Sequence, residues 1–239
     1  MTGTDNRFSL TNEQLKVIAV VTMTIDHIGA YLLPQYDILR IVGRISFPLF
    51  AFMVGQGCIH TKNIYKYLAR MTAFAVVTQI VLLPFQPFYN LNIMFTFVLS
   101  VAVAVVIKKW HNILQNGTAP QKTVAVIFIL TAVAAVYIIC TAADVEYGFW
   151  GCMLAPAAFA GGYLKRAKHS NTYTNQISAF AVVLVLLCFS SYSIQNWSIL
   201  SVLLLCLYNG RKTGKIPKNF FYIYYPLHLV IIHILNTVL

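Results

Sequence analysis

The stretch that decides the fold is VVTMTIDHIGAYLLPQYDILRIVGRISFPLF, residues 20–50. It is apolar over most of its length, but four ionisable side chains, Asp26, His27, Arg40 and Arg44, lie within its two apolar segments, residues 20–33 and 38–50. A charge at the centre of a bilayer costs roughly 2.5 to 3.5 kcal/mol on insertion scales, so such residues usually serve a function. The stretch therefore predicts two neighbouring membrane helices that carry a polar site.

The composition of the whole chain indicates a membrane protein. Of its 239 residues 59% are hydrophobic and only 10% are charged, which is too apolar for a soluble domain. Hydropathy predicts an all-α, polytopic integral membrane bundle of about nine transmembrane helices. We expect these helices at residues 14–33, 37–59, 64–85, 92–107, 122–141, 147–164, 176–190, 196–208 and 219–238. The connecting loops are short, so residues 1–239 are predicted to form a single transmembrane domain.

The basic residues are sorted to one side of this predicted bundle. Of the 17 lysines and arginines, all but Arg40 and Arg44 lie near the start of the chain or follow the second, fourth, sixth and eighth predicted helices. Because short basic loops stay in the cytoplasm, the amino terminus is expected in the cytoplasm and the carboxyl terminus outside. Orientation and anionic lipid explain the net charge of +11, so no nucleic-acid partner is expected. The five cysteines are scattered, and no metal site is expected.

The four buried ionisable residues can meet in space. Arg40 and Arg44 share a helix face, and the short turn at residues 34–36 makes the first two helices antiparallel neighbours. We expect Asp26 to pair with an arginine or to orient the ring of His27. His27 is the natural general base, because imidazole changes protonation near neutral pH, and Arg44 can stabilise an oxyanion. These groups suffice for acyl transfer.

Two other interpretations of the same residues remain open. The ion pairs can be structural and merely hold the first two helices together, in which case replacing His27 would change stability more than activity. Alternatively, the chain is a proton-coupled small-molecule transporter that uses an intramembrane Asp/His/Arg relay. The transporter predicts acidic groups deep in several helices, whereas the sequence offers only Asp26 at such a depth.

Further polar residues are candidates for binding substrate. Tyr225 and His228 lie three residues apart in the ninth predicted helix, so both can face one cavity. Asn92, near the outer end of the fourth helix, and Glu146, before the sixth, are placed to rim an outward opening. We take Tyr225, His228 and Asn92 as the substrate-binding candidates.

Several of these segments resemble the TraX family over nearly the whole chain. The resemblance is carried by LKVIAVVTMTIDHIGAYLLP (15–34), ILRIVGRISFPLFAFMVGQG (38–57), NIMFTF (92–97), YGFWG (147–151) and NGR (209–211) followed by FFYIYYPLHL (220–229). The paired DHIG and GRISFPLF segments are its most specific part. The resemblance implies an acyltransferase-like domain of the kind associated with N-terminal acetylation of pilin.

The resemblance also implies roles for individual residues. In related membrane acyltransferases a basic residue precedes a catalytic His by a few helical turns, and Lys16 stands in that relation to His27. This implies that Lys16 contacts the phosphates of acetyl-CoA. From the residues themselves, we expect Arg40 to help Arg44 polarise the thioester carbonyl or bind the donor. The helix rise separates Lys16 from His27 by roughly 16 Å, comparable to an extended pantetheine arm. Gln56 stands where the family often has Glu, which puts a carboxylate role there in doubt.

We therefore expect a membrane-embedded acetyltransferase that moves acetyl from cytoplasmic acetyl-CoA to an acceptor amine or hydroxyl at the outer side. His27, Asp26 and Arg44 are the predicted catalytic residues, and Lys16 and Arg40 bind the cofactor. The acceptor would be a pilin-like peptide, a surface glycan or a lipid-linked sugar. The expected location is the bacterial inner membrane, which the chain crosses several times.

Overall fold

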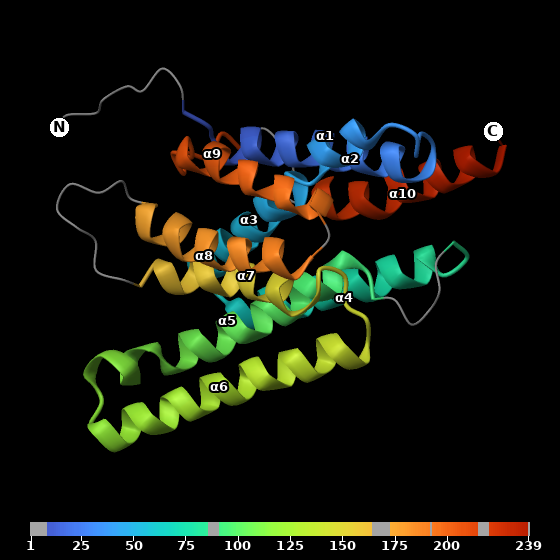
Figure 1. Ribbon diagram of the computed structural model, residues 1–239. Coiled ribbons are helices and arrows are strands. Elements are labelled where there is room, and N and C mark those ends of the chain that lie inside the picture. Colours follow the sequence, from blue (N-terminus) through green and yellow to red (C-terminus); the bar gives the residue numbers. More distant parts are fainter. Residues whose placement is uncertain (1–8, 86–90, 164–172, 192, 215–219, 239) are drawn as a thin grey trace.

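The computed structural model describes residues 9–85, 91–163, 173–191, 193–214 and 220–238, and these ranges are almost entirely helical (Figure 1). They contain ten α-helices and one 3-10 helix, and no strand beyond an isolated bridge between Leu10 and Tyr208. The bounds are α1 Asn12–Tyr31, α2 Asp37–Gly43, α3 Ser46–His60, α4 Ile64–Leu82, α5 Ile93–Asn116, α6 Ala119–Ala142, α7 Gly148–Gly161, α8 Thr174–Ser190, η1 Ser193–Leu200, α9 Ser201–Cys206 and α10 Phe220–Val238. The all-helical prediction is confirmed.

Apolar helices dominate the described chain. Four helical segments are long and apolar enough to cross a membrane: Asp37–His60, Ile93–Asn116, Ala119–Ala142 and Phe220–Val238. α7, α8 and the segment Ile194–Cys206 are apolar but shorter. The chain is therefore a helical membrane protein, while nine crossings and a cytoplasmic amino terminus stay predictions. Six of the basic residues behind that orientation lie outside the described residues, namely Arg7, Lys165, Arg166, Lys168, Lys215 and Lys218.

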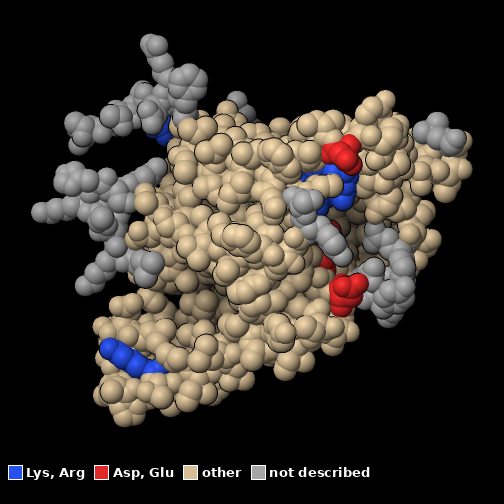
Figure 2. All heavy atoms as spheres, in the orientation of Figure 1, with Lys and Arg blue, Asp and Glu red and all other residues tan. Residues whose placement is uncertain are grey.

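The outward surface of α6 is typical of a helix that faces lipid. Its exposed side chains include Ile127, Leu130 and Ile138, which are 55 to 63% accessible. Figure 2 shows a face built mostly from uncharged side chains, with the charged ones towards its ends. In water such an apolar surface would promote aggregation, whereas in a bilayer it meets hydrocarbon.

Three predicted helices differ from the structure, and the eighth, expected at 196–208, is the 3-10 helix η1 followed by the short helix α9. The second is interrupted between α2 and α3, because Pro48 lacks the N–H that would bond to the carbonyl of Arg44. The fourth does not end at residue 107: α5 continues to Asn116 and stops before Gly117. Lys108 and Lys109 therefore belong to a helix rather than to a loop.

Helices α1 and α10 run side by side in the same direction. Thr24 of α1 shares a hydrogen bond of 2.7 Å with the hydroxyl of Tyr224, and further contacts between the two helices follow in register at either side. α1 begins at a capping box in which Thr11 and Gln14 bond each other's backbone, which satisfies amides that would otherwise lack partners. This alignment brings the first and last described helices to one site.

Candidate functional site

A cavity of about 810 Å³ lies between α1, α3, α4, α5 and α10 and is closed in part by residues 146–147. Its volume is within the range of about 300 to 1,000 Å³ typical of small-molecule sites. Much of its wall is apolar, with Met23, Phe50, Met53, Met71 and Phe97 among the lining residues. The cavity joins a positively charged end to a deeper end that holds the predicted base.

The charged end carries four basic side chains from four separate segments, Lys16, Lys62, Arg70 and Lys212, which we call the basic mouth. The loop that carries Lys212 is fastened to the start of α1, because the Glu13 carboxylate accepts hydrogen bonds from the amides of Thr213 (2.8 Å) and Gly214 (3.1 Å). The ammonium group of Lys16 lies 5.0 Å from the centre of the Phe221 ring. Such a cluster of cations is suited to the phosphates of a nucleotide.

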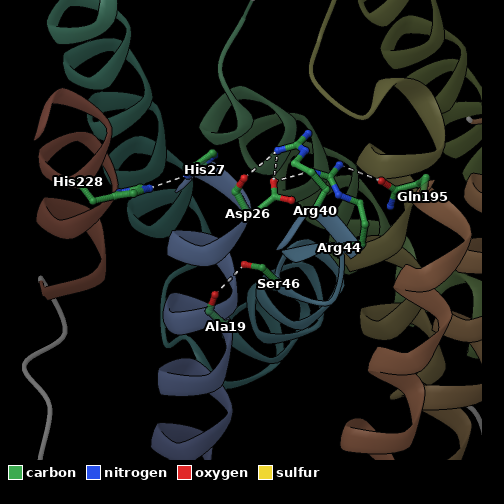
Figure 3. A network of polar contacts seen from close by, with 8 residues as sticks. All are labelled: Ala19, Asp26, His27, Arg40, Arg44, Ser46, Gln195 and His228. Atoms are coloured by element: carbon green, nitrogen blue, oxygen red, sulfur yellow. Dashed lines mark hydrogen bonds and ion pairs between the residues drawn. The ribbon is translucent and has the colours of Figure 1, made fainter. Parts of the chain in front are cut away.

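At the deeper end His27 lines the cavity and forms a histidine pair with His228 (Figure 3). The Nδ1 atom of His27 lies 2.7 Å from Nε2 of His228, and Nδ1 of His228 lies 2.9 Å from the carbonyl oxygen of Tyr224. A carbonyl only accepts, so Nδ1 of His228 carries a proton, and in the neutral ring Nε2 accepts from His27. His27 therefore holds its own proton on Nδ1, and its Nε2 atom keeps a lone pair. This is the protonation state of a general base.

Asp26, the neighbour of His27 in sequence, bonds elsewhere. Its carboxylate accepts from Arg40 at 2.9 Å and from the terminal nitrogen of Arg44, and we call these three residues the ion-pair cluster. Arg44 also donates to Gln195 at 3.3 Å. A methyl group on Gly43 would overlap the Asp26 side chain, so only glycine lets α2 approach this closely. The prediction that Asp26 pairs with an arginine is confirmed.

The ion-pair cluster differs from the sequence predictions for His27 and for the two arginines. Asp26 does not orient His27, because its carboxylate faces α2 whereas the ring faces α10, where His228 is the partner. Arg40 and Arg44 do not line the cavity, since the ion pairs hold their guanidinium groups on the far side of Asp26. Neither is placed to contact a donor or an oxyanion within it.

Only one of the three predicted substrate-binding residues lines the cavity. Tyr225 lines the cavity, whereas His228 lies behind His27 and does not line it. Asn92 caps α5 instead: its side chain accepts from Met94 and donates to Gln79 at 2.7 Å. The amide of Asn92 is thereby satisfied within the fold, away from the cavity wall.

The structure adds two residues to the cavity wall. Glu146 and Tyr147 line the cavity beside the ion-pair cluster, and Tyr147 has a left-handed backbone (φ 63°) with its ring stacked 3.7 Å from that of Phe47. Glu146 keeps solvent access, but the protein around it still raises the pKa of its carboxyl to about 7 by burial, against the positive charge of Arg44. From the sequence, Glu146 was expected at the rim of an outward opening, and no local pattern indicated that it lines the cavity.

Gln56 and Tyr67 also line the cavity. Gln56 was noted only as a departure from the TraX pattern. Within the described ranges no three His, Cys, Asp or Glu side chains come together as metal ligands would.

Comparison with known proteins places the chain in a family. The family model described as "TraX protein" matches residues 11–236. A "Probable fimbrial assembly protein FimC, serogroup H1" of Dichelobacter nodosus is 40% identical over 86 residues, which are 34% of this chain and 32% of that protein. The "Uncharacterized protein RP591" of Rickettsia prowazekii (strain Madrid E) is 42% identical over 88 residues, 36% of this chain and 33% of that protein.

The matched segment thus spans about a third of the length of each of these relatives. No solved structure matches the chain. Because the family model covers nearly all of the described helices, the chain belongs to the TraX family.

Proposed function

We propose that the protein is an acetyltransferase of the bacterial inner membrane, with several crossings, that takes acetyl from acetyl-CoA on the cytoplasmic side. The observation that carries this proposal is that one cavity has the four cations of the basic mouth at one end and the His27 ring at the other. A donor with phosphates, a long flexible arm and a reactive thioester has the same order of groups.

In the proposed reaction the phosphates of CoA bind Lys16, Lys62, Arg70 and Lys212 as point charges. The acceptor amine or hydroxyl attacks the acetyl carbonyl, and Nε2 of His27 takes the proton that the acceptor loses. The bond from carbon to the acceptor forms, the carbon–sulfur bond breaks, and the departing thiolate receives that proton from His27. Tyr225, which lines the cavity, is a candidate donor to the developing oxyanion.

The histidine pair supports the assignment of His27 as the base. His228 is a positioning residue in this proposal, because it fixes the ring and the tautomer of His27 without lining the cavity. The ion-pair cluster neutralises Asp26 and connects α1 to α2. Its role is to place α1 so that His27 reaches the cavity.

The name of the Dichelobacter relative refers to fimbrial assembly, and this favours a pilin-like amino terminus as the acceptor. A surface glycan or a lipid-linked sugar has the same kind of nucleophile, and both belong among the acceptors to be tested.

The competing proposal is the proton-coupled transporter. The specific observation in its favour is that Asp26, His27 and Glu146 all line one cavity, as the carriers of a proton relay would. It predicts no saturable binding of CoA.

Titration calorimetry of the purified protein in detergent tests the choice. We expect saturable binding of acetyl-CoA and of CoA, and transfer of labelled acetyl to a pilin amino-terminal peptide or a glycan acceptor. Absence of CoA binding, together with proton uptake into proteoliposomes on addition of a small solute, would favour the transporter.

A further inference from the structure

Two cysteine side chains face each other where α6 and α7 meet. Cys140 lies two residues before the end of α6, Cys152 lies near the start of α7, and their sulfur atoms are 3.5 Å apart. Both side chains are buried, with 8% and 0% of their surface exposed. Their surroundings are apolar, with Val103, Val136 and Val145 in the same cluster. The two sulfur atoms are thus in contact with each other in an apolar place.

The connection between these cysteines contributes to the cavity. It comprises residues 141–151 and carries Glu146 and Tyr147, which both line the cavity. Its backbone is strained, because two residues other than glycine, Asp144 (φ 41°) and Tyr147 (φ 63°), have left-handed conformations. A link between the two ends of the connection would hold it in this shape.

The two cysteines lie at the end of the bundle opposite the start of α6. Lys122 lies in the first turn of α6, and the helix from Lys122 to Cys140 is about 27 Å long, close to the thickness of the hydrocarbon core. Figure 1 shows the turn between α5 and α6 at the end of the bundle where α1 begins, and the connection between α6 and α7 at the opposite end. The connection contains Asp144 and Glu146 but no lysine or arginine. By the rule for basic loops, we expect this end to face away from the cytoplasm.

We propose that Cys140 and Cys152 form a disulfide in the mature protein, and that this link holds the connection that carries Glu146 and Tyr147. The compartment outside the bacterial inner membrane is oxidising, so disulfides form and persist there. A disulfide has sulfur atoms about 2.05 Å apart, which two side chains already in contact reach by a small shift. The inference uses the proposed orientation in the membrane and is independent of acetyl transfer.

The oxidant in this proposal is an oxidised dithiol protein of that compartment, which acts as the disulfide donor. The thiolate of one cysteine attacks a donor sulfur, and the S–S bond of the donor breaks to give a mixed disulfide. The thiolate of the other cysteine then attacks the mixed disulfide, forms the bond between Cys140 and Cys152 and releases the donor as a dithiol. Each cysteine gives up one proton, each donor sulfur takes up one, and two electrons pass to the donor. Because both side chains are buried in the finished fold, this exchange takes place before α6 and α7 have packed.

The test uses the position of a glutamate between the two cysteines. The chain has two glutamates, Glu13 and Glu146, so a glutamate-specific protease leaves two large pieces, residues 14–146 and 147–239. The full chain is produced in the inner membrane of a bacterium, its free thiols are blocked with N-ethylmaleimide in sodium dodecyl sulfate, and it is then digested. We expect the two pieces to migrate together on a denaturing gel without reductant and to separate after reduction.

Mass spectrometry of the same sample identifies the linked residues. We expect maleimide on Cys58 and on neither Cys140 nor Cys152. Wild-type pieces that separate without reductant, with maleimide on both Cys140 and Cys152, would overturn the proposal. This measurement needs no variant, so it holds even where a variant fails to fold.

Two variants confirm the pairing. With Cys140→Ala the pieces should separate without reductant. Cys58→Ala is the matched control, since Cys58 is another fully buried cysteine, on α3, and its pieces should stay together as in the wild type. A link that Cys58→Ala abolishes would show that Cys58 forms it and would overturn the assignment.

A thermal measurement tests the role of the link. Complete reduction, checked on the gel, should lower the unfolding midpoint of the wild type in detergent by about 5 °C, whereas the same treatment should leave Cys140→Ala unchanged. An unchanged wild-type midpoint would mean that the link does not hold the connection. Saturable binding of CoA is measured separately, so failure of this inference leaves the proposed function standing.

Discussion

Asp26 and His27 are adjacent in sequence, but they belong to two different regions of the molecule. One residue along a helix is a rotation of about 100°, so the Asp26 carboxylate meets α2 and two guanidinium groups while the His27 ring meets α10 and the cavity (Figure 3). The comparison teaches that adjacent residues of one helix can have separate partners. The ion-pair cluster joins α1 to α2, whereas the histidine pair joins α1 to α10 beside the cavity.

The largest expected effect concerns His27 in the histidine pair. His27→Ala should reduce acetyl transfer by at least about 100-fold, because it removes the general base, with little change in CoA affinity. Transfer of labelled acetyl and calorimetry on the same sample measure the two quantities. Full transfer by the variant would remove His27 from the mechanism.

For the ion-pair cluster we expect a loss of stability instead. Asp26→Asn leaves two arginines without their carboxylate, and breaking a buried pair in this way should lower the thermal unfolding midpoint in detergent by about 10 °C. Asp37→Asn, at an exposed site, is the control and should change it by about 1 °C or less. An Asp26→Asn protein that kept its midpoint but lost transfer would assign Asp26 to the chemistry.

His228 lies at the boundary between the two regions. Because it orients His27 without lining the cavity, His228→Phe should lower kcat about tenfold and leave KM for acetyl-CoA unchanged. His228→Gln retains an acceptor for Nδ1 of His27 and should recover part of kcat. His233→Phe is the matched control, since the Nδ1 atom of His233 lies 2.8 Å from the carbonyl oxygen of Leu229 in its own helix and its ring contacts that of Tyr31 instead of His27. An equal effect there would indicate a general disturbance of α10.

The basic mouth should contribute less per residue. Lys16→Ala is expected to weaken CoA binding about fivefold, and the loss should shrink at high ionic strength because the contact is a screened point charge. Lys122→Ala, at the start of α6 and away from the cavity, should bind CoA normally. A salt-independent loss would argue against a phosphate contact.

The smallest effect concerns Glu146, whose carboxyl has a pKa raised to about 7 by burial. A carboxyl with a raised pKa stabilises the folded protein below its unfolded value and loses that contribution as the pH rises through about 7. Glu146→Gln should therefore reduce the fall in thermal midpoint between pH 5 and pH 8, by about 2 °C or less. A variant with an unchanged pH dependence would show that the carboxyl titrates at its ordinary value.

Much of the fold could be predicted from the sequence. Hydropathy located most of the helical segments because bilayer solvent permits few other structures, and charges within the apolar stretch indicated where the ion-pair cluster forms. The interruption of the helix at Arg44 was harder to predict, since a proline kink depends on packing as well as on Pro48.

The partners within the site were harder to predict. Periodicity places His27 on a face of α1, but the choice between Asp26 and His228 as its partner depends on how α10 packs, some 201 residues further along the chain. The same holds for Gln56, whose hydrogen-bond partner is Gln176 on α8. Contacts between distant helices are set by tertiary packing, which single-sequence patterns do not encode.

The parallel alignment of α1 and α10 has a consequence for biosynthesis. Helix α1, which carries His27, is made early in translation, but the His228 ring that fixes the tautomer of His27 arrives only when α10 has been made and has docked. For the acetyltransferase proposed above, a nascent or prematurely terminated polypeptide that lacks α10 would have an unaligned imidazole and would not consume the cell's acyl thioesters before assembly is finished.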